Sequence, residues 1–440
     1  SQLRGAALRV PQEHDGGDTV REAQACRFGT SWNRQRPAVR VEPALVSLAR
    51  PGRTVWDAWW LAAATLDAGC LTDVSGEQSD ARAARIVAAL DADVMVDLSS
   101  HTVTGRPSVV AARPAPLIVS FLGFLGTSGG LADLFISDRT STPAETAPAA
   151  FEEKLALLPR GAALFPPGTY RATLASIRSV PRALEMPPRA TAARTAAGGG
   201  GNGACLPLPD GQWDPVAGEA WLACRTRGHF VFASFSSLYK VDPATFTMWC
   251  NILRRTPQAV LILVSTPRDA VRKLYAEAAA RGVAPWRLLV VPSADHADHI
   301  VRVRRFVHVA LDTPLYNAGT TALDMLWAGV PMITLEGRSV VQRMCASVLR
   351  VAGLEDLVVH SLSDYEDVAV RLGSLRPTML HELLQGPILA ALSAARRPCE
   401  RKTCALFSWP RWTSGLEQLL HASWEARLSM PRPVHVIAGG

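Results

Sequence analysis

Two adjacent threonines, Thr320 and Thr321, follow the predicted buried strand 307–311 at the point where a helix is expected to begin. Asp324 lies three residues after Thr321, which is the spacing of a helix capping box. Gly329 stands where that helix should end. A strand that runs through hydroxyl residues into a helix N-terminus exposes backbone N–H groups that can bind a phosphate. A capped turn with no ligand fits the same pattern.

Lys240 follows the predicted strand 229–235 in a chain that uses lysine rarely. Only four of the 46 basic residues are lysines. A lysine ammonium is a compact point charge, and at a strand end it can neutralise the phosphate of a departing group. A single solvated loop lysine is the simpler alternative.

Two histidines, His296 and His299, follow the predicted strand 287–291 with the spacing H-x-x-H. This spacing can bind a metal, but no third ligand lies nearby in the sequence, so we expect no metal site. A histidine at a helix start can also stack on a base, and nucleotide contact is therefore the functional interpretation we favour. Arg302 lies on the same predicted helix and could face an anion.

The first half of the chain offers a polar cluster after the predicted strand 92–98 and a glycine-rich loop at 122–130. His101 in that cluster could act as a general base, although a structural histidine fits as well. The glycine-rich loop contains Gly126 and Thr127 and lacks the spacing of a Walker lysine motif. We therefore do not expect a nucleoside-triphosphate loop of that type.

Predicted strands and helices alternate along most of the chain, which indicates two α/β domains with doubly wound parallel sheets. A stretch rich in Pro, Ala and Gly separates them. The expected divisions are a poorly ordered remnant at 1–50, a first α/β domain at 51–175, the flexible insertion at 176–215, a second α/β domain at 216–400 and a C-terminal helix and tail at 401–440.

The composition is that of a globular chain of 440 residues, 48% hydrophobic and 19% charged. No apolar run reaches the length of a membrane span, so we expect no membrane partner. The net charge of +7 comes from scattered arginines that do not alternate with aromatic residues, which argues against a nucleic-acid partner. Eight scattered cysteines without a C-x-x-C predict reduced thiols in a cytosolic or nuclear protein. No pattern indicates an oligomeric state.

Four longer runs resemble segments of the protein O-GlcNAc transferases, in the same order along the chain. The first is 122-LGFLGTSGGLADLFISDRTSTPAE-145. The others are 231-VFASFSSLYKVDPATFTMWCNIL-253, 308-HVALDTPLYNAGTTALDMLWAGVPMIT-334 and 363-SDYEDVAVRLGSL-375. The sequences of these four runs are more similar to those of the O-GlcNAc transferases than to those of the SPINDLY-type O-fucosyltransferases.

The resemblance implies a GT-B glycosyltransferase with two Rossmann-like domains facing a cleft, the first of them incomplete. It also implies inverting transfer of GlcNAc from UDP-GlcNAc to Ser or Thr hydroxyls of nuclear and cytosolic proteins, with no cofactor and no metal. Lys240 matches the lysine that stabilises the departing UDP. The other matched positions are Ala294, His299 and Arg302 near the uracil, Thr320 and Thr321 at the pyrophosphate, Asp324 at the ribose, and Gly126 and Thr127 near the sugar and acceptor.

The chain departs from the family pattern at several positions. Gly319 replaces the histidine that usually precedes the threonine pair, and Ser237, still a candidate donor-binding residue, replaces a glutamine. Leu125 replaces a loop proline, and Cys70 stands where a first-domain histidine is usual. Neither an early N-H-P segment nor tetratricopeptide repeats are found. Two alternatives therefore stay open: a divergent or truncated chain that binds UDP without transfer, and a SPINDLY-like enzyme that uses GDP-fucose.

Overall fold

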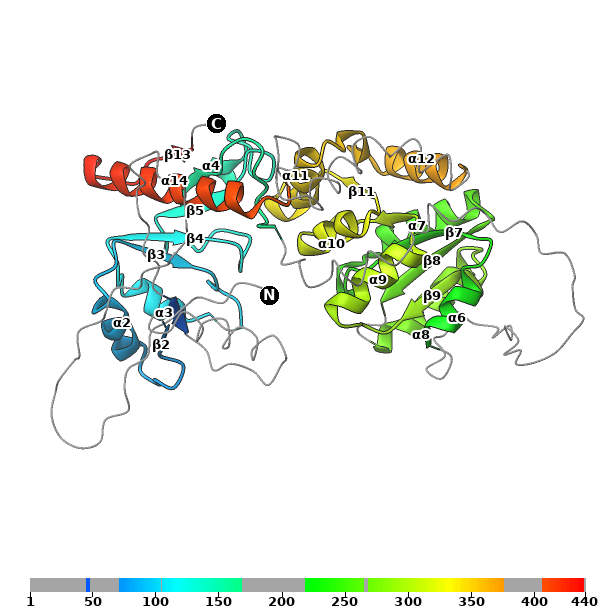
Figure 1. Cartoon of the computed structure of the whole chain (residues 1–440), viewed down its shortest axis with the longest axis horizontal. Helices are drawn as coiled ribbons and strands as arrows, with labels where there is room; N and C mark the ends of the chain where they lie inside the picture. Colours follow the sequence, from blue (N-terminus) through cyan, green and yellow to red (C-terminus); the bar gives the residue numbers. More distant parts are fainter. Residues whose placement is uncertain are drawn as a thin grey trace, which may run out of the picture. The chain divides into compact units, whose positions relative to one another are not determined.

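The computed structural model describes residues 45–47, 71–103, 105–167, 218–264, 268–375 and 406–438. The chain divides into two compact units, Ser1–Arg160 with Thr413–Gly440, and Gly161–Trp412 (Figure 1). The insertion expected at 176–215 lies outside the described residues, as does the remnant expected at 1–50 apart from residues 45–47.

The second unit is built on a six-stranded parallel sheet in the order β12-β11-β10-β7-β8-β9 (Figure 1). The chain builds outward from β7 to β9 and then returns to the other side of β7 with β10, which is the order of a doubly wound Rossmann sheet. Ligands bind such sheets at the carboxyl ends of the two strands where the order reverses, here β7 and β10. The strands are β7 (Phe230–Ser234), β8 (Ala259–Val264), β9 (Leu288–Val291), β10 (Val309–Leu311), β11 (Met332–Leu335) and β12 (Val358–Val359).

Helices follow the strands, and α7 and α10 begin or end at the kinds of residue that usually cap helices. Asp242 caps α7 by accepting a hydrogen bond from the Thr245 backbone N–H at 3.0 Å, and Pro243 is the first helical residue. Gly329 ends α10 in the left-handed conformation, with φ of 87°. The helices are α6 (Gly218–Arg225), η3 (Leu238–Lys240), α7 (Pro243–Arg255), α8 (Arg268–Ala280), η4 (Pro285–Arg287), α9 (His296–Phe306), α10 (Thr320–Ala328), η5 (Val340–Gln342), α11 (Met344–Val351), η6 (Glu355–Leu357) and α12 (Leu362–Gly373).

The capping box expected from Thr321 and Asp324 is wrong. The N-cap of α10 is Gly319, Thr320 is the first helical residue, and no side chain caps the helix. Glycine has no side chain to accept a hydrogen bond, so the leading N–H groups of α10 keep no capping partner from that position. The carboxylate of Asp324 is instead engaged by His296.

The core of this unit holds the carboxyl end of β7 in place. Every residue of β7 and β8 is buried, and α7 packs Trp249 and Ile252 into the core cluster that includes these strands. Full burial of such a side chain stabilises a fold by roughly 1.5–3 kcal/mol. The buried guanidinium of Arg287 donates to the carbonyls of Leu253 and Ala259, which ties the end of α7 to the sheet.

The first unit contains a five-stranded parallel sheet in the order β13-β6-β5-β4-β3 (Figure 1). Strand β13 comes from the C-terminal segment, so the stretch expected as a helix and tail also supplies an edge strand to this sheet. The Leu155 N–H donates to His435 Nδ1 at 3.0 Å beside that pairing. The elements are β1 (Leu45–Ser47), β2 (Leu71–Asp73), α2 (Asp80–Ala88), β3 (Val94–Asp97), α3 (Pro107–Ala111), β4 (Leu117–Ser120), β5 (Leu134–Ser137), α4 (Ala147–Ala150), β6 (Lys154–Leu157), α14 (Trp409–Ser429) and β13 (Val436–Ile437).

One cysteine contradicts the expectation of reduced thiols throughout. Cys224 is disulfide-bonded, whereas Cys250 and Cys345 are free and buried. The spacing of the cysteines follows no pairing rhythm, so no local signal indicated this disulfide. Within the described ranges, none of the helices combines the length and the hydropathy that crossing a bilayer requires.

Candidate functional site

The loops after β7 and β10 meet at the carboxyl edge of the second sheet, where the strand order reverses. The Thr313 hydroxyl, just after β10, lies 3.2 Å from the Ser236 hydroxyl, just after β7. The ammonium of Lys240 lies 3.9 Å from the centroid of the Tyr316 ring. Two loops whose contacting residues are 77 positions apart in the sequence therefore form one surface, as the Rossmann topology requires.

Asp312, which directly follows β10, organises this edge and was missed by the sequence analysis. It is fully buried, and its carboxylate accepts hydrogen bonds from the backbone N–H groups of Thr313 at 2.8 Å and Ala318 at 2.7 Å. The Thr334 hydroxyl donates to its other oxygen at 2.6 Å. Burial raises the pKa of Asp312 to about 6 against the opposing effect of these hydrogen bonds. The signal was an acidic residue placed directly after an apolar strand.

Lys240 is a half-buried lysine at the end of η3, with Ser237 as the half-buried N-cap of that turn. Burial lowers the pKa of Lys240, and the charge of Asp312 opposes that shift. Among the described residues, the Lys240 ammonium forms no ion pair. This ammonium lies near the switch point without a directly paired carboxylate in that part of the chain, which suits an anionic ligand.

The N-terminus of α10 lies after the same β10 loop. Thr320 is exposed and Thr321 is half-buried, and their backbone N–H groups have no acceptor within the described part of the chain. The next two amides, of Ala322 and Leu323, donate to the Gly319 carbonyl. Free amides at the positive end of a helix dipole favour a negative group.

Gly319 is packed against the ring of Phe165, which the sequence analysis also missed. A Cβ at position 319 would lie 2.3 Å from Phe165 Cζ. The φ of Gly319 is −103°, outside the left-handed region that favours glycine, and the space taken by the Phe165 ring excludes a side chain here. The aromatic ring occupies the room that a histidine side chain at this position would need.

The side chains expected near a base sit at the start of α9. His296 Nε2 lies 3.0 Å from Asp324 Oδ1, and this hydrogen bond raises the pKa of His296 above 6.5. His299 packs edge-on against Phe235 with ring centroids 4.7 Å apart, and burial lowers its pKa to about 4. His299 is therefore a neutral ring at pH 7. His296 binds Asp324 from α9, a contact that the sequence analysis did not predict.

Arg302 is occupied by the protein itself. Its Nε donates to Glu219 Oε1 at 2.8 Å, and its Nη1 donates to the Pro292 carbonyl at 2.8 Å. These bonds fix the loop between β9 and α9, which carries Ala294. Ala294 is half-buried and directly precedes Asp295, the N-cap of α9. The structure thus gives Arg302 a supporting position, and a direct nucleotide contact stays a prediction.

In the first unit, His101 contacts the glycine-rich loop. Its Nε2 lies 3.0 Å from the Ser128 carbonyl oxygen, and its ring packs edge-on against Phe124. A carbonyl can only accept, so Nε2 carries the proton and, in the neutral ring, Nδ1 keeps its lone pair. The preceding turn is held by Asp97, which accepts from the Ser100 N–H at 3.0 Å. This arrangement leaves an exposed, oriented imidazole that can accept a proton.

A buried carboxylate holds the glycine-rich loop. Glu153 accepts from the Ser128 N–H at 2.7 Å, from the Ser128 hydroxyl and from the Gly130 N–H at 3.3 Å. Burial raises the pKa of Glu153, but these hydrogen bonds outweigh it, so the pKa lies below its usual range. Thr127 Oγ1 accepts a hydrogen bond from the Gly129 N–H at 3.1 Å. Gly126, the residue before Thr127, is half-buried. The amides that could have held a phosphate here already have an internal acceptor.

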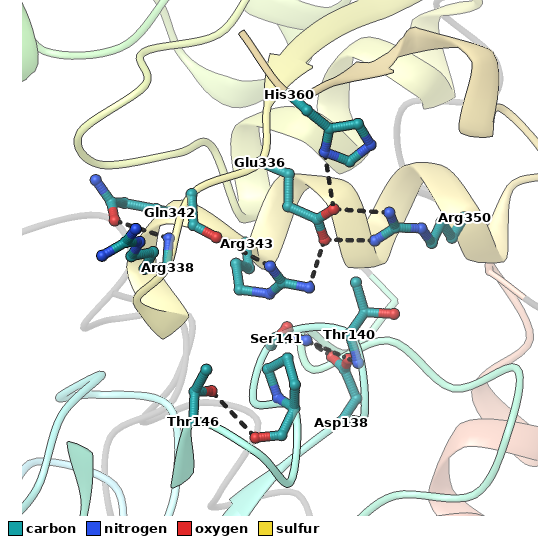
Figure 2. Close-up of polar contacts among 12 residues, drawn as sticks. Asp138, Thr140, Ser141, Thr146, Glu336, Arg338, Gln342, Arg343, Arg350 and His360 are labelled. Atoms are coloured by element: carbon teal, nitrogen blue, oxygen red, sulfur yellow. Dashed lines mark hydrogen bonds and ion pairs between the residues drawn. The ribbon is translucent and has the colours of Figure 1, made fainter. Parts of the chain in front are cut away.

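A further charged cluster follows β11 in the second unit (Figure 2). The side chain of Glu336 is 5% exposed and accepts a two-point hydrogen bond from Arg350, with Arg343 at 2.7 Å and His360 at 3.6 Å. Burial raises the pKa of Glu336, and its arginine partners lower it further than burial raises it. The cluster anchors α11 to the sheet. Across the described residues, no group of His, Cys, Asp and Glu side chains could hold a metal ion.

These features define a class. The second unit has a Rossmann-ordered sheet with a lysine and a free helix N-terminus at its switch point, and the first unit contains a second parallel α/β sheet. Two such units fit the GT-B class of glycosyltransferases. The sequence matches Glycosyl transferase family 41 over residues 62–174 and 226–390. The chain belongs to this family.

The relatives agree with the assignment. A probable UDP-N-acetylglucosamine–peptide N-acetylglucosaminyltransferase SEC of Arabidopsis thaliana is 32% identical over 365 residues, 82% of this chain and 32% of that protein. The corresponding transferase of Caenorhabditis elegans is 32% identical over 44% of this chain and 16% of its own length. A mutant Thermobaculum terrenum O-GlcNAc transferase superimposes with a TM-score of 0.64 at 25% identity, covering 86% of this chain and 61% of that one. The chain spans a third or less of these two curated relatives.

We predict that Gly319→His destabilises the fold by roughly 1–3 kcal/mol, because the new side chain overlaps Phe165 and overpacks the site. Urea unfolding of Gly319→His, Phe165→Ala and the double variant measures this. The double variant should lose less stability than the sum of the single ones. Gly76→His is the control, since nothing lies within 4 Å of a Cβ there. Strictly additive losses would contradict the packing account.

We also predict that His296 titrates above its ordinary value of 6.5, whereas His299 titrates near 4. Since the folded pKa of His296 is raised, its pairing with Asp324 stabilises the fold fully below pH 6.5 and loses that effect as the pH rises through the folded pKa. NMR titration of the imidazole signals tests this. Asp324→Asn should lower the pKa of His296, and the exposed-site control Asp298→Asn should leave it almost unchanged. A His296 pKa at or below 6.5 in the parent chain would refute the pairing.

Proposed function

We propose that this chain is the catalytic region of an inverting glycosyltransferase that moves GlcNAc from UDP-GlcNAc to Ser or Thr hydroxyls of cytosolic or nuclear proteins. The observation that carries the proposal is that two loops meet at the switch point of the second sheet. One carries Lys240, which forms no ion pair among the described residues, and the other leads into the free amides of Thr320 and Thr321. The relatives are named as UDP-N-acetylglucosamine–peptide N-acetylglucosaminyltransferases, which supports the same donor and acceptor classes.

The donor would lie along the carboxyl edge of the second sheet. Its diphosphate would accept hydrogen bonds from the first amides of α10, with the Lys240 ammonium opposite them. The nucleoside would lie towards the start of α9, where the neutral ring of His299 can stack on a base and Asp324 can accept from ribose hydroxyls. Lysine and helix dipole supply the positive charge that a divalent metal supplies elsewhere, so we expect no metal requirement.

The chemical step would be a single displacement at the anomeric carbon. The acceptor oxygen forms a bond to C1 of the sugar while the bond from C1 to the UDP oxygen breaks, which inverts the configuration. The leaving diphosphate gains negative charge, and Lys240 with the α10 amides stabilises that charge. The acceptor proton goes to a base. His101 is the candidate because the residue is exposed and its contact with the Ser128 carbonyl leaves Nδ1 as the acceptor nitrogen of the neutral ring.

One observation favours the alternative of nucleotide binding without transfer. Gly319, backed by Phe165, lacks the side-chain donor that the family usually places beside the phosphates. Loss of one positioned donor to a transition state typically lowers the rate about 100- to 1,000-fold. We therefore expect binding of UDP to be retained more fully than turnover.

Two assays test the proposal. Calorimetry with UDP, UDP-GlcNAc and GDP-fucose should show binding of the two uridine nucleotides and none of the third. Transfer of radiolabelled GlcNAc to a Ser/Thr peptide should fall about 100-fold in Lys240→Ala and remain unchanged in Lys273→Ala, a lysine exposed on α8. Turnover that survives Lys240→Ala would overturn the role of the lysine, and binding of GDP-fucose alone would favour the fucosyl alternative.

A further inference from the structure

We propose that Tyr316 is a positioning residue for Lys240: its ring holds the lysine ammonium at the switch point and leaves its charge available to an anionic ligand. The role of Lys240 as the phosphate-facing cation rests on the proposed function. The contact between the two side chains stands independently of it.

The geometry is that of a cation–π pair. The Lys240 ammonium lies 3.9 Å from the centroid of the Tyr316 ring, well inside the limit of about 6 Å for this interaction. In the described part of the chain the ammonium forms neither a hydrogen bond nor an ion pair. The carboxylate of Asp312 acts on Lys240 only through its charge, because its own oxygens are bound to backbone and Thr334. The ring is therefore the direct support of the lysine.

The Tyr316 loop is fixed on both sides of the ring. The Thr313 hydroxyl donates to the Tyr316 carbonyl at 2.7 Å, and the Asn317 N–H donates to the Val341 carbonyl at 2.8 Å. The Ala318 N–H is held by Asp312. A flexible four-carbon lysine stem thus rests on a surface that the backbone places accurately. About two-fifths of Tyr316 remains exposed, at 39%, so the ring is not a core side chain that the fold needs.

An aromatic support differs from a carboxylate in its effect on a phosphate. A carboxylate at this position would neutralise the ammonium and repel an incoming diphosphate. The ring face attracts the cation through its quadrupole but carries no net charge. Lys240 is consequently ordered without losing the charge that an anionic ligand would need. Tyr239 directly precedes Lys240 in the sequence and is 77% exposed. It therefore offers a matched aromatic control for substitutions of Tyr316.

The contact can be measured in the free protein because the chain has only four lysines. Selective ¹³C-lysine labelling gives four ε-methylene signals, which single Lys→Arg variants assign. The Lys240 signal should lie upfield of the other three because of the Tyr316 ring current. Tyr316→Phe should keep that shift, Tyr316→Leu should abolish it, and Tyr239→Leu should leave it. A Lys240 signal at the ordinary lysine position in the parent chain would overturn the proposal.

The functional part is tested by UDP calorimetry and donor kinetics on the same variants. Tyr316→Leu should weaken UDP binding several-fold and lower kcat, while Tyr316→Phe and Tyr239→Leu stay near the parent. Equal UDP affinity and kcat in Tyr316→Leu, with the ring-current shift lost, would refute positioning by Tyr316. Absence of UDP binding in every variant, with the ring-current pattern intact, would instead reject the proposed function and leave the contact established.

Discussion

The second unit depends on one buried carboxylate, that of Asp312. Removing a charge from water costs several kcal/mol, and this cost is offset only when hydrogen bonds replace the lost hydration. Here the Thr313 and Ala318 amides and the Thr334 hydroxyl provide them, and the Tyr365 hydroxyl donates to the Asp312 carbonyl from α12. These hydrogen bonds hold the loop between β10 and α10, which carries Tyr316 and leads into the first turn of α10.

Acidic side chains at strand ends hold loops in the first unit as well. Asp97 accepts from the Ser100 N–H after β3, and Asp138 accepts from the Ser141 N–H at 2.8 Å after β5 (Figure 2). Glu153 holds the glycine-rich loop by accepting hydrogen bonds from the Ser128 and Gly130 N–H groups. These internal acceptors leave few amides for a ligand. The start of α10 is different, because Gly319 provides no capping side chain, and the free amides there are the reason to place an anion on the second unit.

The sequence predicted the strands and their alternation with helices because continuous apolar runs and capping residues such as Asp242 are local signals. It also singled out Lys240 and the threonine pair, since both follow strands of a doubly wound sheet. It could not reveal contacts made across the fold: the burial of Asp312, the ring of Phe165 over Gly319, or the reach of His296 to Asp324. The capping prediction failed for the same reason, because the partner of Asp324 lies on another helix.

The central claim is that the edge between β7 and β10 is a site for a nucleoside diphosphate. The most direct measurement is a crystal structure of the chain with UDP. The account predicts the β-phosphate within hydrogen-bonding distance of the Thr320 and Thr321 amides, with the Lys240 ammonium beside it and Asp312 unmoved. A nucleotide bound at the glycine-rich loop of the first unit, with Glu153 displaced and the α10 amides unoccupied, would contradict it.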